Sequence, residues 1–141
     1  MKDMFVLKSE ICLFDKVEDF LRKENVCEDD LIITNRFIFD GKYKTSAHLI
    51  FQEEYGKGEP TDGMVDAILD ALREKEFNRI IAIGGGTVVD IAKVVAVAGK
   101  EDKVDDLYDH VDSLKKVHPL VIIPTTCGTG SEVTNISVIN R

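Results

Sequence analysis

The sequence predicts an α/β fold in which a Rossmann-like parallel sheet carries helices on both faces. Short apolar runs rich in β-branched residues alternate with segments of helical periodicity, and two glycine-rich loops directly follow predicted strands. Strands that alternate with crossover helices form parallel sheets, and ligands of such sheets bind beyond the carboxyl ends of the strands. We therefore expect both loops at the same edge of the sheet, close to a ligand.

The first half of the chain is predicted to contain a short helix and two strands. The segment "VEDFLRKE" follows Asp15, and the pair Asp15 and Glu18 predicts a capped helix start. Strands are predicted for "LIIT" from Leu31 and for "AHLIF" from Ala47. Residues 35–46 between these strands have a weak pattern that suits either a helix or a loop.

The second half continues the alternation of helices and strands. Apolar residues recur at helical spacing from Thr61 to Phe77, and the run "RIIAI" from Arg79 predicts a buried strand. The apolar segment after the glycines predicts a packed helix that stops near Gly99. The acidic run "KEDKVDDLYDHVD" favours a solvated connector or a short surface helix. "LVIIP" from Leu120 predicts another strand, and the final apolar string "ISVI" is expected to belong to a terminal strand.

Composition limits the class of protein and its partners. With 141 residues, of which 44% are hydrophobic, the chain can bury the core of one domain. A formal charge of -8 argues against binding to nucleic acid or to anionic membranes. The three widely spaced cysteines favour a reducing compartment, and neither a signal peptide nor an 18-residue apolar run is found. We expect a cytoplasmic protein with small-molecule partners.

The first glycine-rich loop lies in "GGGTVVDIAK", which begins at Gly84. Glycines let a ligand phosphate approach the backbone, and a helix that starts near Thr87 would add free N–H groups, its dipole and a hydroxyl. Alternatively, Thr87 and Asp90 form a T-x-x-D cap, and the glycines only let strand and helix meet tightly. The dinucleotide fingerprint is incomplete because Val89 stands where its third glycine belongs, and no Gly-Lys-Ser or Gly-Lys-Thr indicates a P-loop.

The second loop, "PTTCGTGSEVTN", is rich in hydroxyl groups and glycine. It can therefore surround a polar ligand with hydrogen-bond donors and close backbone contacts. Taken alone, it is also consistent with a simple turn followed by a helix cap at Ser131. Two such loops at one sheet edge favour an extended phosphate-containing ligand, such as a dinucleotide, over two unrelated tight turns.

In this order, the two loops resemble the two cofactor motifs of the iron-dependent (group III) alcohol dehydrogenase family. The usual forms of these motifs are GGGS-x-x-D-x-A-K and P-T-T-x-G-T-G-S-E-V-T. The segments "FQEEYGKGEPTDGM" and "TTCGTGSEVTNISV" most resemble the 4-hydroxybutyrate dehydrogenase branch of that family. The resemblance implies that residues 1–141 are the N-terminal dinucleotide-binding domain of the dehydroquinate synthase-like fold, and that the C-terminal helical, metal-binding domain is absent from this chain.

The resemblance also implies cofactor-binding roles for individual residues. The pyrophosphate would lie against the first loop, Asp90 would lie close to the cofactor, and the threonines of the second loop would line its adenine and ribose portions or its nicotinamide side. Thr87 stands where serine is commoner and keeps the hydroxyl. The residues implied in the two loops are Gly85, Gly86, Thr87, Asp90, Thr125, Thr126, Thr129 and Thr134.

Asn35 is the main departure from the family pattern. It follows the strand "LIIT", where relatives often have an acidic residue that bonds the ribose hydroxyls and repels a 2′-phosphate. Asparagine can still bond a hydroxyl group, but it lacks the repelling charge. We expect NAD as the cofactor, with NADP as the open alternative.

By the same resemblance, the full-length enzyme would be a homo-oligomer that converts 4-hydroxybutyrate and succinate semialdehyde into one another. It would hold divalent iron, or another divalent metal, only through the missing domain. We expect no metal ligands among His48, His110 and His118, and no nucleophilic role for Cys127. The chain alone is expected to bind cofactor without turning over an alcohol or aldehyde substrate.

Three alternatives stay open at the level of the sequence. The chain could be a free-standing nucleotide-binding or regulatory module. It could belong to a dehydrogenase of the same family that acts on another small alcohol, or to a related branch such as the glycerol dehydrogenases or sugar-phosphate cyclases. It could also be a protein-interaction domain whose glycine-rich loops are purely structural.

Overall fold

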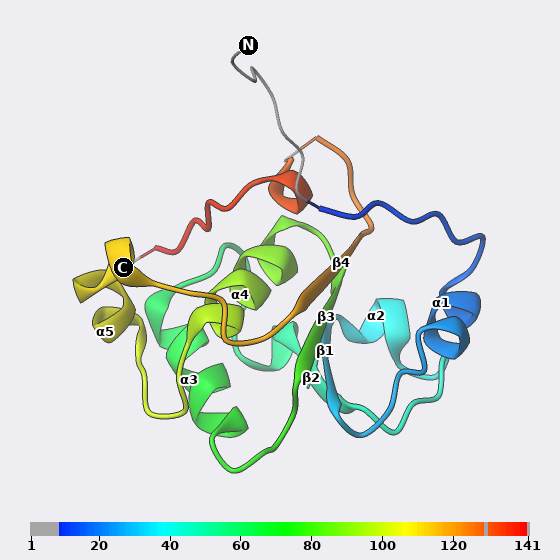
Figure 1. The fold of residues 1–141 in the computed structure, drawn as a ribbon, viewed down its shortest axis with the longest axis horizontal. Coiled ribbons are helices and arrows are strands. Elements are labelled where there is room, and N and C mark those ends of the chain that lie inside the picture. The colour runs from blue at the N-terminus through cyan, green and yellow to red at the C-terminus, as the bar shows by residue number, and fades with distance from the viewer. Residues whose placement is uncertain (1–8, 129, 141) are drawn as a thin grey trace.

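The computed structural model describes residues 9–128 and 130–140 (Figure 1). Strands and helices largely alternate along the described part of the chain, with short 3-10 helices (η) after β2, after α5 and after β4. In chain order the elements are α1 (Val17–Lys23), β1 (Asp30–Thr34), α2 (Arg36–Phe39), β2 (His48–Phe51), η1 (Gln52–Glu54), α3 (Asp62–Leu72), β3 (Arg79–Gly84), α4 (Gly86–Val97), α5 (Val104–Asp109), η2 (Val111–Ser113), β4 (Leu120–Pro124) and η3 (Ser131–Val133).

The four strands form one parallel sheet in the order β2-β1-β3-β4. In the register of this sheet, Leu31 pairs with His48 on one side and with Ile80 on the other, and Ile80 pairs with Leu120. The central strands are continuous apolar runs because both faces of the sheet are covered. The predicted parallel α/β fold is confirmed.

Helices cover the sheet on both faces, as Figure 1 shows, with α1 and α2 on one side and α3, α4 and α5 on the other. Successive residues of each strand point to opposite faces and enter two separate cores. Leu31 and Ile80 pack with the larger set of helices, whereas Ile32 and Ile81 pack with α1 and α2 through Phe20 and Phe39 of those helices.

The strand order places a topological switch point between β1 and β3. The chain leaves β1 toward β2 on one side and leaves β3 toward β4 on the other side. In doubly wound sheets, the loops at the carboxyl ends of two such strands diverge and leave a crevice that binds the ligand; the corresponding edge of this sheet is called the crevice. The residues that follow Thr34 and Gly84 border this crevice.

Several predicted boundaries differ from the observed ones. Helix α1 begins at Val17, as predicted, but its N-cap residue is Lys16 rather than Asp15. No side chain bonds the helix start, so the predicted cap of Asp15 and Glu18 was wrong. Helix α3 ends at Leu72 rather than near Phe77. The acidic run forms the short helix α5, one of its two predicted alternatives, although Val104 of this helix is buried in the core.

The expected terminal strand at "ISVI" was wrong. Of residues 134–140, only Asn140 forms a β-bridge, with Thr61 at the start of α3, and the remainder lies in no strand. The backbone N–H of Asp62 donates to Asn140 O at 3.0 Å, and the N–H of Asn140 donates to Pro60 O at 2.8 Å. Figure 1 shows this segment in red, running past α4 toward α5 rather than along the sheet edge.

None of the helices in the described part of the chain is long and apolar enough to cross a membrane.

Candidate functional site

The first glycine-rich loop joins β3 directly to α4 at the crevice edge. Gly85 is the N-cap residue of α4 and Gly86 its first residue, so the helix begins one residue before Thr87. No side chain caps this end, and Gly85, Gly86 and Thr87 are partly exposed. The first-turn N–H groups have no partner within the helix, so they are available to an anion together with the positive end of the helix dipole.

Gly84 has a structural role in this loop. A β-carbon built on Gly84 would lie 2.9 Å from Val88 Cβ, which is closer than real β-carbon contacts allow. The absence of a side chain therefore lets the end of β3 meet the first turn of α4. Gly84 therefore serves the structural role expected in the alternative interpretation of this loop, in which glycines only let the strand and the helix meet tightly.

The T-x-x-D cap does not form. Thr87 lies inside the helix, and its Oγ1 is 3.5 Å from Gly58 O, at the limit of a hydrogen bond. The Asp90 carboxylate instead accepts a hydrogen bond from Ser131 Oγ at 2.6 Å and one from Val138 N at 3.3 Å. Because the start of α4 has no side-chain cap, its donors stay open toward the crevice.

The second loop lies against the first, as expected for two loops at one sheet edge. The N–H of Thr125 donates to Gly84 O at 3.0 Å, and a β-carbon on Gly85 would lie 3.2 Å from Thr126 Oγ1. Both threonines are exposed beyond the end of β4. Thr129, the third threonine implied in this loop, lies outside the described residues.

Asp90 and Lys93 of α4 fix the continuation of the second loop. The Lys93 ammonium donates to Ser131 Oγ at 2.8 Å, to Thr134 Oγ1 at 3.2 Å and to Ile136 O at 2.8 Å. Its Nζ lies 3.6 Å from Asp90 Oδ1, and Ser137 Oγ donates to Asp90 O at 2.8 Å. Asp90 and Thr134, two of the predicted cofactor-binding residues, therefore belong to one hydrogen-bond network that holds residues 131–138 on α4. The alternative cap at Ser131 is absent, since that hydroxyl bonds Asp90 and no side-chain cap forms at η3.

Burial affects the pKa of Lys93. The side chain is only 10% exposed, and this desolvation lowers its pKa, while the nearby Asp90 carboxylate opposes the shift. The ammonium meets four oxygen atoms, which compensates for its removal from water. Its contacts identify it as an anchor of the second loop.

Asn35 lies at the carboxyl end of β1, on the other side of the crevice, as the N-cap residue of α2. Its side-chain amide donates to Gln52 Oε1 at 3.1 Å and to Glu53 Oε2 at 3.0 Å, which joins the ends of β1 and β2. Thr34, the last residue of β1, donates through Oγ1 to Ile83 O at 2.7 Å and holds β1 against β3. In the structure, Asn35 therefore lies away from the two glycine-rich loops and next to the carboxylate of Glu53.

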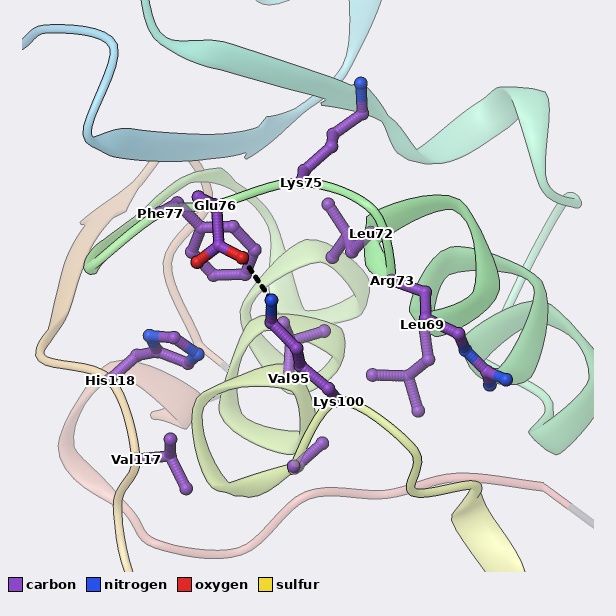
Figure 2. A pocket seen from close by; sticks show the side chains of 12 residues that line it. Leu69, Leu72, Arg73, Lys75, Glu76, Phe77, Val95, Lys100, Val117 and His118 are labelled. Carbon is purple, nitrogen blue, oxygen red and sulfur yellow. Dashed lines mark hydrogen bonds and ion pairs between the residues drawn. The ribbon is translucent and has the colours of Figure 1, made fainter.

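A pocket of about 190 Å³ lies at the opposite end of the sheet, away from both loops (Figure 2). It is lined by residues that precede β3 and β4, among them Phe77 and His118, and by the ends of α3 and α4. Two of its lining residues, Glu76 and Lys100, form the ion pair drawn as a dashed line in Figure 2. The rings of Phe77 and His118 stack with centroids 4.6 Å apart. Because it borders the amino ends of the strands, this pocket is separate from the crevice.

The described residues contain no group of three or more histidine, cysteine, aspartate or glutamate side chains arranged to hold a metal ion. Two of the three histidines bond backbone carbonyl groups: His48 Nε2 lies 3.1 Å from Glu76 O, and His118 Nδ1 lies 2.7 Å from Asn78 O. Cys127 is exposed in the second loop and forms no disulfide.

Sequence reasoning missed three residues that shape this site. Lys93 belongs to the motif "GGGTVVDIAK". Its position three residues after Asp90 places both side chains on one face of the helix, which could have indicated their pairing. Gln52 and Glu53 carry no local signal, because only the pairing of β1 with β2 brings them to Asn35.

Comparison with known proteins places these features in a family. The family model "Iron-containing alcohol dehydrogenase" matches residues 12–141. A 4-hydroxybutyrate dehydrogenase of Clostridium kluyveri is 44% identical over 135 residues, which cover 94% of this chain and 36% of that protein. The chain thus spans about a third of the length of this curated relative.

Solved structures share the fold. The iron-containing alcohol dehydrogenase of Thermotoga maritima matches 81% of this chain and 36% of its own, with a TM-score of 0.56 and 28% identity. Sulfoacetaldehyde reductase from Bifidobacterium kashiwanohense, solved in complex with NAD+, matches 84% of this chain and 33% of its own, with a TM-score of 0.62 and 23% identity.

Proposed function

Because this chain belongs to the iron-containing alcohol dehydrogenase family, we propose that it is the dinucleotide-binding portion of a metal-dependent alcohol dehydrogenase that uses NAD. The main supporting observation is the uncapped start of α4, bordered by partly exposed glycines and by the exposed threonines of a second loop. A structure of this fold that was solved with NAD+ also supports the proposal.

The described residues fit a dinucleotide at this edge. The N–H groups of Gly86 and Thr87 and the Thr87 hydroxyl would hold the pyrophosphate, since helix starts of this kind bind phosphate. Thr125 and Thr126 add hydroxyl groups beside Gly85. When bound, the nicotinamide accepts a hydride from an alcohol or donates one to an aldehyde.

Asp90 and Lys93 would support the site without forming its phosphate-binding surface. They hold Ser131 and the residues after it on α4, so the second loop keeps one position relative to the first. Fixed loops lower the ordering cost when a ligand binds. Metal binding is not assigned to this chain, because its described residues contain no suitable ligand group.

The proposed substrate is 4-hydroxybutyrate, converted to succinate semialdehyde or formed from it. The support is the similarity to the Clostridium kluyveri enzyme, which extends over nearly all of this chain. A direct test joins this chain to the remaining part of that relative and measures NADH formation with 4-hydroxybutyrate and with butan-1-ol. Preference for butan-1-ol would contradict the proposed substrate.

Titration with NADH tests the proposed dinucleotide site. We expect saturable binding, measured by calorimetry, that Gly86→Val abolishes because a branched side chain would crowd the backbone donors. Thr87→Val should weaken binding about tenfold through loss of a hydrogen bond to a charged phosphate.

Thr87→Ser is the matched control, since it keeps the hydroxyl and should bind NADH like the original chain. Circular dichroism checks that every variant is folded. Failure of the folded, unmodified chain to bind NADH would contradict the proposed function.

A further inference from the structure

The carboxyl ends of β1 and β2 carry an acidic cluster that the glycine-rich loops do not explain. One arginine, Arg36, lies among three carboxylates, those of Asp40, Glu53 and Glu54. β1 is the direct neighbour of β3, which carries the glycine-rich loop. In dinucleotide-binding sheets, a carboxylate in this region bonds the adenine ribose of NAD, whereas an arginine accommodates the extra phosphate of NADP.

Glu53 is the carboxylate of this cluster that is held by the start of α2, directly after β1. Its Oε1 accepts the backbone N–H of Arg36 at 2.6 Å, and its Oε2 accepts the Asn35 amide at 3.0 Å. The two carboxylate oxygens can together accept about four hydrogen bonds, so these donors leave capacity for a ligand hydroxyl. Partial burial raises the pKa of Glu53, but the N–H groups of Glu53 and Arg36 and the Asn35 amide outweigh it and lower the pKa overall. The side chain is therefore ionised at neutral pH.

Asn35 itself has little capacity left to donate. Its two amide hydrogens serve Gln52 and Glu53, at nitrogen-oxygen distances of 3.1 and 3.0 Å. It therefore positions the carboxylate of Glu53, in η1 just after β2, beside the end of β1, where Asn35 itself carries no charge. Glu53, from the 3-10 helix after the neighbouring strand, supplies the negative charge that Asn35 lacks.

Arg36 is not free to receive a phosphate. Its guanidinium forms ion pairs with Asp40, at 2.8 Å, and with Glu54, and it lies 4.4 Å from the centroid of the Phe51 ring. These contacts hold the only cation of the cluster between carboxylates and an aromatic face. With one positive and three negative side chains, this end of the crevice repels a phosphate.

We propose that Glu53 determines cofactor specificity: its carboxylate, positioned by Asn35, accepts the ribose hydroxyls of NAD and repels the 2′-phosphate of NADP. The inference rests on the proposed function, because it concerns the adenine end of the same dinucleotide site. Glu53 follows β2 and the glycine-rich loop follows β3, and these strands are two strand spacings apart, about 10 Å. An extended dinucleotide spans this distance.

The experiment compares NADH and NADPH binding to the chain and to Glu53→Gln by calorimetry. The glutamine keeps the shape and an oxygen acceptor but removes the charge. We expect the original chain to prefer NADH and Glu53→Gln to raise the affinity for NADPH relative to NADH by about tenfold or more, because a doubly charged phosphate no longer faces a carboxylate.

Glu101→Gln is the matched control, since it removes the same charge from an exposed side chain after α4, away from the crevice. It should leave the NADH to NADPH ratio unchanged. An unchanged ratio in folded Glu53→Gln, or equal affinities of the original chain for both cofactors, would overturn the assignment of Glu53 and leave the dinucleotide site standing. Absence of NADH binding in the original chain would instead overturn the proposed function.

Discussion

At the scale of single residues, hydrogen bonds fix the polar groups that border the crevice and those that support it. Glu53 is held by Asn35 and by the backbone of Arg36, and Lys93 is held by the hydroxyl and carbonyl oxygens of the second loop. A polar group that is fixed before ligand binding costs less to order when the ligand arrives. Conservative substitutions of these residues should therefore change the ionisation of the site and its selectivity for NAD or NADP more than they change the fold.

Glu53 should make the stability of the chain depend on pH in the acidic range. Its pKa is lower in the folded chain than in the unfolded chain, so its contribution is present above the unfolded value of about 4.3 and is lost as the pH falls through the folded value. The difference in unfolding free energy between the original chain and Glu53→Gln should shrink when the pH falls from about 7 to about 3. Urea unfolding at several pH values measures it.

Asn35→Ala provides the comparison, since it removes one donor from the carboxylate and should reduce this pH dependence. A difference between the original chain and Glu53→Gln that stays constant over the whole pH range would contradict the prediction.

At the scale of elements, the junction of β3 and α4 decides the geometry of the site. Gly84 lies at the end of the strand, and the first turn of α4 packs over it through Val88. This close contact brings the uncapped helix start to the edge of the sheet. A wider junction would move the free N–H groups away from the second loop.

Gly84→Ala should destabilise the chain by about 1–3 kcal/mol, because the added methyl group meets Val88 and overpacks the junction. The midpoint of urea unfolding measures the change. Gly63→Ala in α3 is the matched control: a β-carbon there meets no atom within 4 Å, and alanine should stabilise the helix by about 0.4–1 kcal/mol. Equal stability of Gly84→Ala and the original chain would refute the packing argument.

At the scale of the whole molecule, residues 131–140 link parts of the chain that are distant in sequence. Ser131 and Ser137 bond Asp90 of α4, and Asn140 bonds the backbone on both sides of Thr61. The segment thus connects the second loop, α4 and the start of α3. Three apolar side chains of this segment are exposed to solvent: Val133, Ile136 and Val138.

Lys93→Met should loosen this segment without unfolding the sheet. The substitution removes three hydrogen bonds to residues 131–136, so the amides of Val138 and Asn140 should exchange with solvent about tenfold faster. Hydrogen exchange with mass spectrometry measures the effect. Lys100→Met is the control, since it removes an exposed ion pair at the other end of the sheet. Unchanged exchange in residues 131–140 would show that Lys93 does not hold the segment.

Local patterns predicted the elements that depend on near neighbours in sequence. The runs "LIIT" and "RIIAI" became buried strands because their continuous apolar side chains suit a sheet covered on both faces. The string "ISVI" has a similar composition but formed no strand, because Lys93 and Asp90 bind its backbone and neighbours to α4. Such distant side-chain anchors carry no periodic signal.

The sequence by itself determined the parallel α/β fold, the family and the adjacency of two glycine-rich loops, because apolar periodicity and loop motifs are local properties of the chain. Only the tertiary structure decided that α4 starts without a side-chain cap, that Asp90 and Lys93 hold the second loop, and that Glu53 lies beside Asn35. These contacts join residues from different strands and helices, and strand order and helix packing bring them together.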